Sequence, residues 1–371
     1  MNLSEQQGEA IRVIANRSAW RNQYAWLAGF AGSGKTSIAP FLVEEMKARA
    51  PLYVAPTNKA ARVLGSKVGR EAISIHKAIY YPPDENPDSG ALGWTINRDG
   101  AAAHADVIIC DEASMVGTRL GQDLMSFGVP VVAIGDPGQL PPVQDDPFFC
   151  IGQPDFMLTE IHRQARDNPI IALSQRIREG ERLKVGRMGD AVQIAERGDV
   201  DMPETMPQII VGTHKKRWSV TAKVRKFLGH EGWLPQPGEP LISRKNNPET
   251  GLINGDELRC TEGGSWCRPG EYHTVDIHTD RGHLGVYDGL LMEHREREKR
   301  PWRLEERSPE WIAQRAHDHL DFGHAITCHV AQGSQWPHVL VYDESRVFRD
   351  EWQRWLYTAV TRASERLTVI V

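Results

Sequence analysis

The sequence lacks an apolar run long enough to cross a membrane. A spanning helix needs about 18 or more consecutive apolar residues, and no stretch of the 371-residue chain reaches that length. The N-terminal segment MNLSEQQ also lacks the basic region and the apolar stretch that together make a secretion signal. We therefore expect a protein without membrane association that works in the cytoplasm.

Cysteine is too scarce and too scattered to form a disulfide framework. The chain has five cysteines, an odd number, and Cys110 and Cys328 lie in apolar segments that favour buried thiols in a reducing compartment. One group of possible metal ligands lies close together in the sequence: Cys260, Cys267, His273 and His278. Its spacing does not match the paired C-x₂₋₄-C pattern of structural zinc sites, so we predict no zinc there.

An excess of basic residues is also absent. The formal net charge is −5 at pH 7, whereas domains that coat nucleic acid are usually basic. This balance argues against a coating protein, but it leaves room for a local basic groove that binds a strand. The hydrophobic content of 40% and the charged content of 25% are typical of a globular protein. The length allows two or three domains.

What the sequence does contain is a complete phosphate loop. Residues 29–36 read GFAGSGKT, which matches G-x-x-x-x-G-K-[ST]. An apolar run at Tyr24–Ala28 precedes the loop and a segment with helical spacing at Ser37–Lys47 follows it, so a helix N-terminus would point at bound phosphates. Backbone N–H groups would cradle the phosphates, Lys35 would reach the β- and γ-phosphates, and Thr36 would bind Mg²⁺.

Two carboxylates follow a later apolar strand, Val107–Cys110. We expect Asp111 to hold Mg²⁺ through water and Glu112 to orient and deprotonate the water that attacks the γ-phosphate. Adjacent carboxylates of this kind favour hydrolysis over transfer to a bound small molecule. A GTPase is not expected, because the segment that begins Asn58-Lys59-Ala60 lacks the acid of a guanine-reading Asn-Lys-x-Asp motif.

The next predicted strand ends in the sequence GDPGQLPP at residues 135–142. Its prolines predict a rigid loop at the carboxyl edge of the sheet, where ligands of open α/β sheets bind. From this loop Gln139 could contact the γ-phosphate and report its presence. This makes Gln139 a further candidate site residue.

Residues 1–165 are predicted to form one α/β domain. They alternate helical stretches with short apolar runs such as Leu52–Ala55 and Val129–Ile134, the pattern of a parallel sheet buried on both faces. A Pro-, Asp- and Gly-rich stretch at about residues 79–105 is predicted to be a small insert. Residues 94–100 within it could form a hairpin with an Asp-Gly turn.

Residues 166–371 are predicted to form a second α/β domain. A helix is expected at Ile170–Glu179, and strands are expected at Gln208–Val211, Val339–Tyr342 and Leu367–Val371. Turn signals between about residues 240 and 320 predict a small β-rich insert. The charged run at Glu293–Arg307 is expected to be a solvated helix or linker.

Taken in order, these motifs resemble those of superfamily 1 DNA helicases, most closely the RecD-like branch that includes the Dda-type phage helicases. The resemblance rests on the phosphate loop, on DEAS at residues 111–114 and on GDPGQLPP. Further segments are similar to the family's other motifs: 3–11, 55–61, 74–77, 158–164, 252–256, 325–334 and 355–363. The resemblance implies two RecA-like parallel-sheet domains, with a small hairpin insert in the first and a small SH3-like β-barrel in the second.

The resemblance also implies roles for individual residues. The implied catalytic residues are Lys35, Glu112 and Gln139, with Arg163 and Arg362 as arginine fingers. The implied ATP-binding residues are Gln7, which would read adenine, Gly29, Gly32, Ser33, Gly34, Lys35, Thr36, Gln332 and Gly333. Thr36 and Asp111 would hold Mg²⁺.

The residues implied to bind DNA are Pro56, Thr57, Asn58, His76, Trp94, His329 and Ser334. Trp94, Tyr80 or Tyr81 would supply a wedge that splits a duplex. Val330 and Ala331 replace the Lys and Ser that the family usually has, which removes a phosphate contact to the strand and puts the DNA affinity of this motif in doubt.

We therefore predict an ATP-dependent DNA helicase or translocase that uses ATP and Mg²⁺ and moves 5′ to 3′ on single-stranded DNA. Only the resemblance implies this polarity. Two alternatives stay open: an RNA helicase of the same superfamily, and a non-motor DNA-binding loader or scaffold. The predicted partners are single-stranded DNA, its junctions with duplex, and replication or recombination proteins. We expect a monomer in the cytoplasm of a bacterium or of a phage-infected host.

Overall fold

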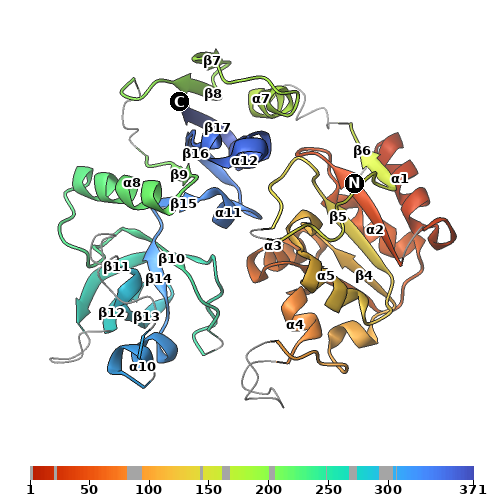
Figure 1. The fold of residues 1–371 in the computed structure, drawn as a ribbon, viewed down its shortest axis with the longest axis horizontal. Helices are drawn as coiled ribbons and strands as arrows, with labels where there is room; N and C mark the ends of the chain where they lie inside the picture. The colour runs from red at the N-terminus through yellow and green to blue at the C-terminus, as the bar shows by residue number, and fades with distance from the viewer. Residues whose placement is uncertain are drawn as a thin grey trace. The chain divides into compact units, whose positions relative to one another are not determined.

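The computed structural model describes the chain except for residues 1–2, 21–22, 82–93, 143–144, 161–167, 200–204, 248, 267–273, 292–303 and 306. The chain divides into two compact units, each built on its own sheet (Figure 1). Unit 1 comprises residues 1–183, 333–335 and 350–361, and unit 2 comprises residues 184–332, 336–349 and 362–371. The predicted domain boundary at residue 165 remains a proposal.

Unit 1 is built on a six-stranded sheet in the order β3-β2-β4-β5-β1-β6, and every pair of neighbours is parallel. The strands are β1 (Tyr24–Gly29), β2 (Pro51–Ala55), β3 (Ala72–Ser74), β4 (Val107–Cys110), β5 (Val131–Gly135) and β6 (Phe156–Leu158). Strands β4 and β5 are buried along their whole length. Such strands need cover on both faces, which helices supply. The predicted α/β class is confirmed.

Seven α-helices of unit 1 are described: α1 (Glu5–Ala15), α2 (Ala39–Glu45), α3 (Asn58–Val68), α4 (Ile75–Ile79), α5 (Thr118–Met125), α7 (Pro169–Arg178) and α12 (Trp352–Val360). The alternation of side chains along a strand divides the core between the two faces of the sheet. Val107 and Ile109 join a cluster that contains Leu42 of α2. Ile108 joins a second cluster that contains Leu124 of α5.

The first insert is described at residues 94–105. The hairpin expected at Asp99-Gly100 is not formed there, because Ala101–His104 turns as a 3₁₀ helix. Consecutive alanines have little preference for extended structure, so no second strand of a hairpin forms after Asp99-Gly100. The antiparallel contact of this region is a single bridge between Tyr80 and Ile96.

Unit 2 is built on a sheet in the order β15-β9-β16-β17-β8-β7, which is parallel except for its edge strand β7. The elements are β7 (Gly186–Met188), β8 (Val192–Ala195), β9 (Gln208–Val211), β15 (Ala325–Thr327), β16 (Trp336–Tyr342), β17 (Ala363–Ile370), α8 (His214–Phe227) and α11 (Cys328–Ala331). The Thr213 hydroxyl caps α8 by accepting from the Lys216 N–H.

The second insert is a five-stranded antiparallel sheet in the order β13-β12-β11-β10-β14. Its elements are β10 (Pro240–Ser243), β11 (Glu257–Trp266), β12 (Thr274–Thr279), β13 (Gly282–Tyr287), β14 (Leu320–Phe322) and helix α10 (Pro309–Ala316). The chain enters through β10 and leaves through β14, and these two strands pair. The SH3-like barrel stays a prediction, and most of the charged run at 293–307 lies outside the described residues.

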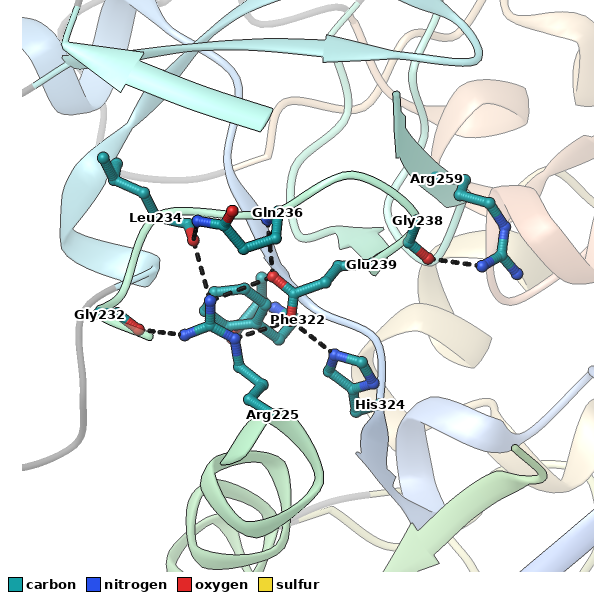
Figure 2. A network of polar contacts seen from close by, with 10 residues as sticks. Arg225, Gly232, Leu234, Gln236, Gly238, Glu239, Arg259, Phe322 and His324 are labelled. Carbon is teal, nitrogen blue, oxygen red and sulfur yellow. Dashed lines mark hydrogen bonds and ion pairs between the residues drawn. The ribbon is translucent and has the colours of Figure 1, made fainter. Parts of the chain in front are cut away.

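A buried ionic network lies where the second insert begins and ends (Figure 2). Arg225 of α8 donates through Nε to Glu239 Oε1 at 2.7 Å and through a terminal nitrogen to Oε2 at 3.1 Å. It also donates to the carbonyls of Gly232 and Leu234. His324 Nε2 lies 2.9 Å from Glu239 Oε1. The network thus joins α8, the segment before β10 and the residues after β14.

A second ion pair connects the same helix to the insert. Arg217, two turns before Arg225 on α8, donates to Asp321 of β14 at 2.7 Å, and both side chains are buried. Removing one partner of a buried pair leaves an uncompensated charge, which costs about 3–5 kcal/mol. Helix α8 therefore fixes both ends of the insert. Among all the described helices, none is long and apolar enough to span a bilayer.

Candidate functional site

The phosphate loop has the backbone that its glycines predict. Gly32 and Gly34 have φ angles of 83° and 73°, a region that residues with a Cβ rarely adopt. A Cβ on Gly29, the last residue of β1, would lie 2.6 Å from the Ser33 hydroxyl oxygen. The loop then runs into a 3₁₀ turn at Thr36–Ile38 and into α2. The order of strand, loop and helix is the predicted one.

Lys35 has an acidic neighbour that the sequence interpretation did not assign. Its Nζ lies 3.8 Å from Oδ2 of Asp136, the residue that directly follows β5, and Asp136 has no exposed surface. The other oxygen of Asp136 accepts the Gly138 N–H at 2.9 Å. The carboxylate therefore fixes the turn that leads to Gln139 and also attracts the lysine of the phosphate loop.

Thr36 and Asp111 come together as predicted for a magnesium site. The Thr36 hydroxyl donates to Asp111 Oδ2 at 3.0 Å. The other oxygen, Asp111 Oδ1, is buried and has no hydrogen-bond partner within the described part of the chain. A carboxylate oxygen and a hydroxyl at the end of a phosphate loop are hard oxygen ligands of the kind Mg²⁺ prefers. The donor set therefore fits the ion.

Glu112, the predicted general base, has a left-handed backbone conformation. Its φ and ψ are 51° and 37°, which costs a residue with a side chain about 1–2 kcal/mol. The turn falls directly after β4 and changes the direction of the chain between the two carboxylates. Unfavourable backbone of this kind gathers at functional sites, which agrees with the role predicted for this residue.

Several other buried polar atoms near these motifs lack a hydrogen-bond partner among the described residues. They are Ser33 Oγ in the phosphate loop, Ser114 Oγ after Glu112, and Gln139 Oε1. An unsatisfied buried polar group costs about 1–3 kcal/mol. Three of these groups in the predicted nucleotide motifs are consistent with a site whose partners come from a ligand. Gln139 itself is buried.

Gln7, the predicted adenine-reading residue, is bound to the phosphate loop and to its own helix. Its Oε1 accepts the Ser4 N–H at 3.1 Å, which completes the capping box of α1. Its Nε2 donates to the Ser33 carbonyl at 3.4 Å. The structure therefore puts Gln7 next to the loop, with both ends of the amide bonded to protein.

Two side chains that the sequence interpretation left without a role also reach the phosphate loop. The Tyr357 hydroxyl of α12 accepts the Ala31 N–H at 2.8 Å and donates to Asp136 Oδ2 at 2.7 Å. Arg178, the last residue of α7, lies with its guanidinium carbon 3.3 Å from the centre of the Phe30 ring. Tyr357 lies in a segment with a predicted motif and Arg178 in a predicted helix, but nothing in their local sequence indicates contact with residues 30–31.

The predicted strand-binding residues of unit 1 lie at helix starts and in an aromatic cluster. Thr57 caps α3 by accepting the Ala60 N–H, and Asn58 is the first residue of that helix. The His76 and Trp94 rings lie 4.9 Å apart, and the Trp94 and Tyr80 rings stack at 5.4 Å. Trp94 is 51% exposed, so it presents a ring edge or face to solvent.

Burial lowers the pKa of His76, and it lowers the pKa of His329 in the same way. Both imidazoles are therefore neutral at pH 7 and would contact a strand by stacking or hydrogen bonding rather than as cations. The His329 ring lies 6.1 Å from that of Phe348 within unit 2. Gly333, which lies in the same predicted motif as His329, belongs to unit 1. A Cβ on Gly333 would lie 3.4 Å from the Ala60 Cβ.

Of the remaining predicted residues, Pro56 and Ser334 are buried in unit 1. Gln332 and Arg362 are buried in unit 2. Arg163 lies outside the described residues, as do Cys267 and His273 of the zinc alternative. No group of three or more His, Cys, Asp or Glu side chains in the described part of the chain is arranged to hold a metal.

The folds and sites just described are those of an α/β protein with a phosphate loop. A family model described as an AAA domain matches residues 2–199, more than half of the chain, and the chain belongs to that family. A second model, the UvrD-like helicase C-terminal domain, matches residues 322–370.

Two relatives of the RecD-like branch are similar to the chain. It is similar to the ATP-dependent RecD2 DNA helicase of Deinococcus radiodurans, with 28% identity over 98% of this chain and 48% of the relative. It is also similar to the ATP-dependent DNA helicase dda of Enterobacteria phage T4, with 28% identity over 48% of this chain and 43% of the relative. The chain thus spans about half the length of these relatives. The predicted resemblance to RecD-like and Dda-type proteins is confirmed.

A solved structure supports the fold. A structure described as the basis for DNA unwinding at forked duplex DNA by two coordinating Pif1 helicases aligns with a TM-score of 0.60 and 18% identity. The alignment covers 100% of this chain and 92% of the other. At this identity the match concerns the fold alone.

Proposed function

We propose that this protein is an ATP-dependent DNA helicase or translocase that hydrolyses ATP with Mg²⁺ and moves 5′ to 3′ on single-stranded DNA. The observation that carries the proposal is the arrangement of Lys35, Thr36 and Asp111 around one phosphate loop, with no partner for Asp111 Oδ1 among the described residues. This is a site for a metal-bound triphosphate, and the RecD-like relatives are named as ATP-dependent DNA helicases.

The chain's own residues supply the proposed chemistry in separate roles. Lys35 leaves its ion pair with Asp136 to neutralise charge on the β- and γ-phosphates. Thr36 and Asp111 would hold Mg²⁺, which neutralises charge as it develops on the phosphate oxygens. Glu112 accepts a proton from the attacking water, and Gln139 orients that water or contacts the γ-phosphate.

Two arginine fingers complete the proposed catalytic set. Arg163 and Arg362 are proposed to stabilise the charge of the transition state, a contribution that reaches about 10³–10⁵-fold in related chemistry. The proposal for Arg362 draws on its place in a segment similar to a helicase motif and on its match to the UvrD-like model. The two arginines belong to different motifs, so each needs its own variant.

The proposed strand contacts are Thr57 and Asn58 at the start of α3, and the aromatic cluster of His76, Tyr80 and Trp94. Aromatic stacking on bases is worth about 1–3 kcal/mol per base and tolerates any sequence. The stacked arrangement of Trp94 on Tyr80 supports a role in separating or gripping bases. His329 and Ser334 are proposed as further contacts.

The first test is whether a single strand stimulates ATP hydrolysis. We expect DNA oligonucleotides to raise the turnover of Mg²⁺-ATP by about tenfold or more, as expected for a coupling of 1–3 kcal/mol between two sites. RNA of the same sequence is the matched control. Stimulation by RNA alone would indicate an RNA helicase, and a chain that binds DNA but never hydrolyses ATP would indicate a loader or scaffold.

The second test is strand displacement on duplexes that carry either a 5′ or a 3′ single-stranded tail. The proposal expects unwinding from the 5′ tail in the presence of ATP and Mg²⁺ and none with ADP. Unwinding from the 3′ tail alone would overturn the proposed polarity. The proposed partners are single-stranded DNA, its junctions with duplex, and replication or recombination proteins. The protein is proposed to act as a monomer in the cytoplasm.

A further inference from the structure

The Tyr357 hydroxyl links two parts of the nucleotide site through hydrogen bonds. It accepts the N–H of Ala31 in the phosphate loop and donates to Asp136 in the loop that carries Gln139, at 2.8 and 2.7 Å. Tyr357 is almost fully buried. Burial raises its pKa well above the ordinary value, and the Asp136 carboxylate raises it further, so the hydroxyl keeps its proton and can donate at any working pH.

The partners of this hydroxyl are groups whose charge or bonding changes with the nucleotide. Ala31 belongs to the loop whose N–H groups face phosphate, and Asp136 attracts Lys35 at 3.8 Å. When Lys35 turns to a γ-phosphate, the fully buried Asp136 loses the nearby positive charge. The Tyr357 O–H and the Gly138 N–H are then its remaining compensation in the described structure.

A second contact ties the same turn of α12 to the Gln139 loop. The Thr358 hydroxyl accepts the Leu140 N–H at 2.9 Å, and Thr358 has no exposed surface. Neighbouring residues of one helix therefore contact both loops that face the γ-phosphate. Helix α12 leads through Thr361 directly into Arg362, the proposed finger.

We propose that Tyr357 is a positioning residue that transmits the presence of a γ-phosphate from the phosphate loop and Asp136 to α12, and so couples nucleotide binding to strand binding. The inference rests on the proposed function, because it assumes that the protein binds both ATP and a single strand. It requires that the two ligands change each other's affinity, and that the change depends on the Tyr357 hydroxyl.

The test compares Tyr357→Phe with Tyr53→Phe in the full chain. Tyr53 is a second buried tyrosine, in β2, and its hydroxyl has no hydrogen-bond partner among the described residues. The Kd of fluorescent ATPγS and of ADP is measured with and without a saturating DNA oligonucleotide. We expect the oligonucleotide to change the ATPγS Kd of the wild type and of Tyr53→Phe by about tenfold, and to change the ADP Kd much less.

In Tyr357→Phe we expect the effect of the oligonucleotide on the ATPγS Kd to fall below about twofold, so that ATPγS behaves like ADP. A merely structural role would lower the Tm and leave this ratio intact. Thr358→Val, which removes the acceptor for Leu140, is expected to reduce the ratio as well and serves if Tyr357→Phe does not fold. A Tyr357→Phe protein that keeps the wild-type ratio overturns the inference.

The inference and the proposed function fail in different ways. A wild type in which neither DNA nor RNA alters the ATPγS Kd overturns the proposed function and the inference with it. A wild type with strong coupling that Tyr357→Phe and Thr358→Val both preserve overturns the inference alone. Loss of coupling in these two variants but not in Tyr53→Phe supports it.

Discussion

The nucleotide site of unit 1 and the ionic network of unit 2 bury polar groups in opposite ways. In the nucleotide site, Ser33 Oγ, Asp111 Oδ1 and Gln139 Oε1 are buried without a partner in the described structure. In the network of Figure 2, both oxygens of Glu239 accept hydrogen bonds, and Arg225 donates through all three of its nitrogens. Unmatched buried groups are expected at a ligand site, whereas matched groups are expected in a structural network.

Removing one partner of the matched network should have the largest effect on stability. Arg225→Leu leaves the Glu239 carboxylate buried without its cation, so we expect the free energy of unfolding to fall by about 3–5 kcal/mol. Urea unfolding followed by circular dichroism measures the change. The control is Arg176→Leu, whose ion pair with Glu181 is about half exposed and should contribute less than about 1 kcal/mol. Equal losses in the two variants would contradict the comparison.

Removing a charge from the unmatched site should affect catalysis instead. We expect Lys35→Ala to lower ATP turnover by about 100-fold or more, because charge on the γ-phosphate loses its neutralisation. The free energy of unfolding should fall by less than in Arg225→Leu, because the ion pair with Asp136 is long, at 3.8 Å, and Asp136 keeps its hydrogen bonds from Tyr357 and Gly138. Steady-state ATPase assays and the same urea series check both. Lys67→Ala, an exposed change on α3, is the control and should leave turnover intact.

Acid should act on the network through Glu239. Burial raises the pKa of this carboxyl group, but hydrogen bonds from His324 and Arg225 outweigh it and lower the pKa from 4.5 to about 2. The folded state therefore binds its proton less readily than the unfolded chain, so this contribution to stability is complete above pH 4.5 and is lost as the pH falls towards 2. Urea unfolding between pH 6 and pH 3 should show a steeper loss in the wild type than in Glu239→Gln. Parallel curves would contradict this assignment.

The smallest effect is expected from Ser33→Ala. The Ser33 hydroxyl is buried and unpartnered among the described residues, so its removal should leave the free energy of unfolding unchanged or raise it by up to about 1 kcal/mol. Nucleotide binding should weaken only modestly if the hydroxyl meets a phosphate. Thermal unfolding with and without Mg²⁺-ADP measures both. A loss of more than about 1 kcal/mol in the nucleotide-free protein would show that Ser33 is structural.

The parts of the site that could be predicted are those that the chain keeps local. The phosphate loop occupies consecutive residues, and Asp111 and Glu112 directly follow a strand whose composition is unmistakable. The parallel pairing of β4 with β5 then brings the Gln139 loop to the same edge. In these cases spacing along the chain determines spacing in the structure.

The contacts that could not be predicted join residues far apart in the sequence. Tyr357 meets Ala31 across 326 positions, and no local pattern indicates which tyrosine reaches the loop. The same holds for His324, which meets Glu239 across 85 positions, because the pairing of β10 with β14 brings the two residues together. The Asp99-Gly100 hairpin was wrong for a local reason: the turn signal was present, but the alanines after it form a 3₁₀ helix.

The interleaving of the two units has a consequence for synthesis on the ribosome. Lys35, Thr36 and Asp111 are all made early, but the segment that returns Tyr357 and Thr358 to unit 1 follows nearly the whole of unit 2. A nascent chain that ends at residue 183 would display the phosphate loop without the helix that contacts it. Completion of the nucleotide site therefore waits until residue 361 has been added, after the entire second insert has been translated.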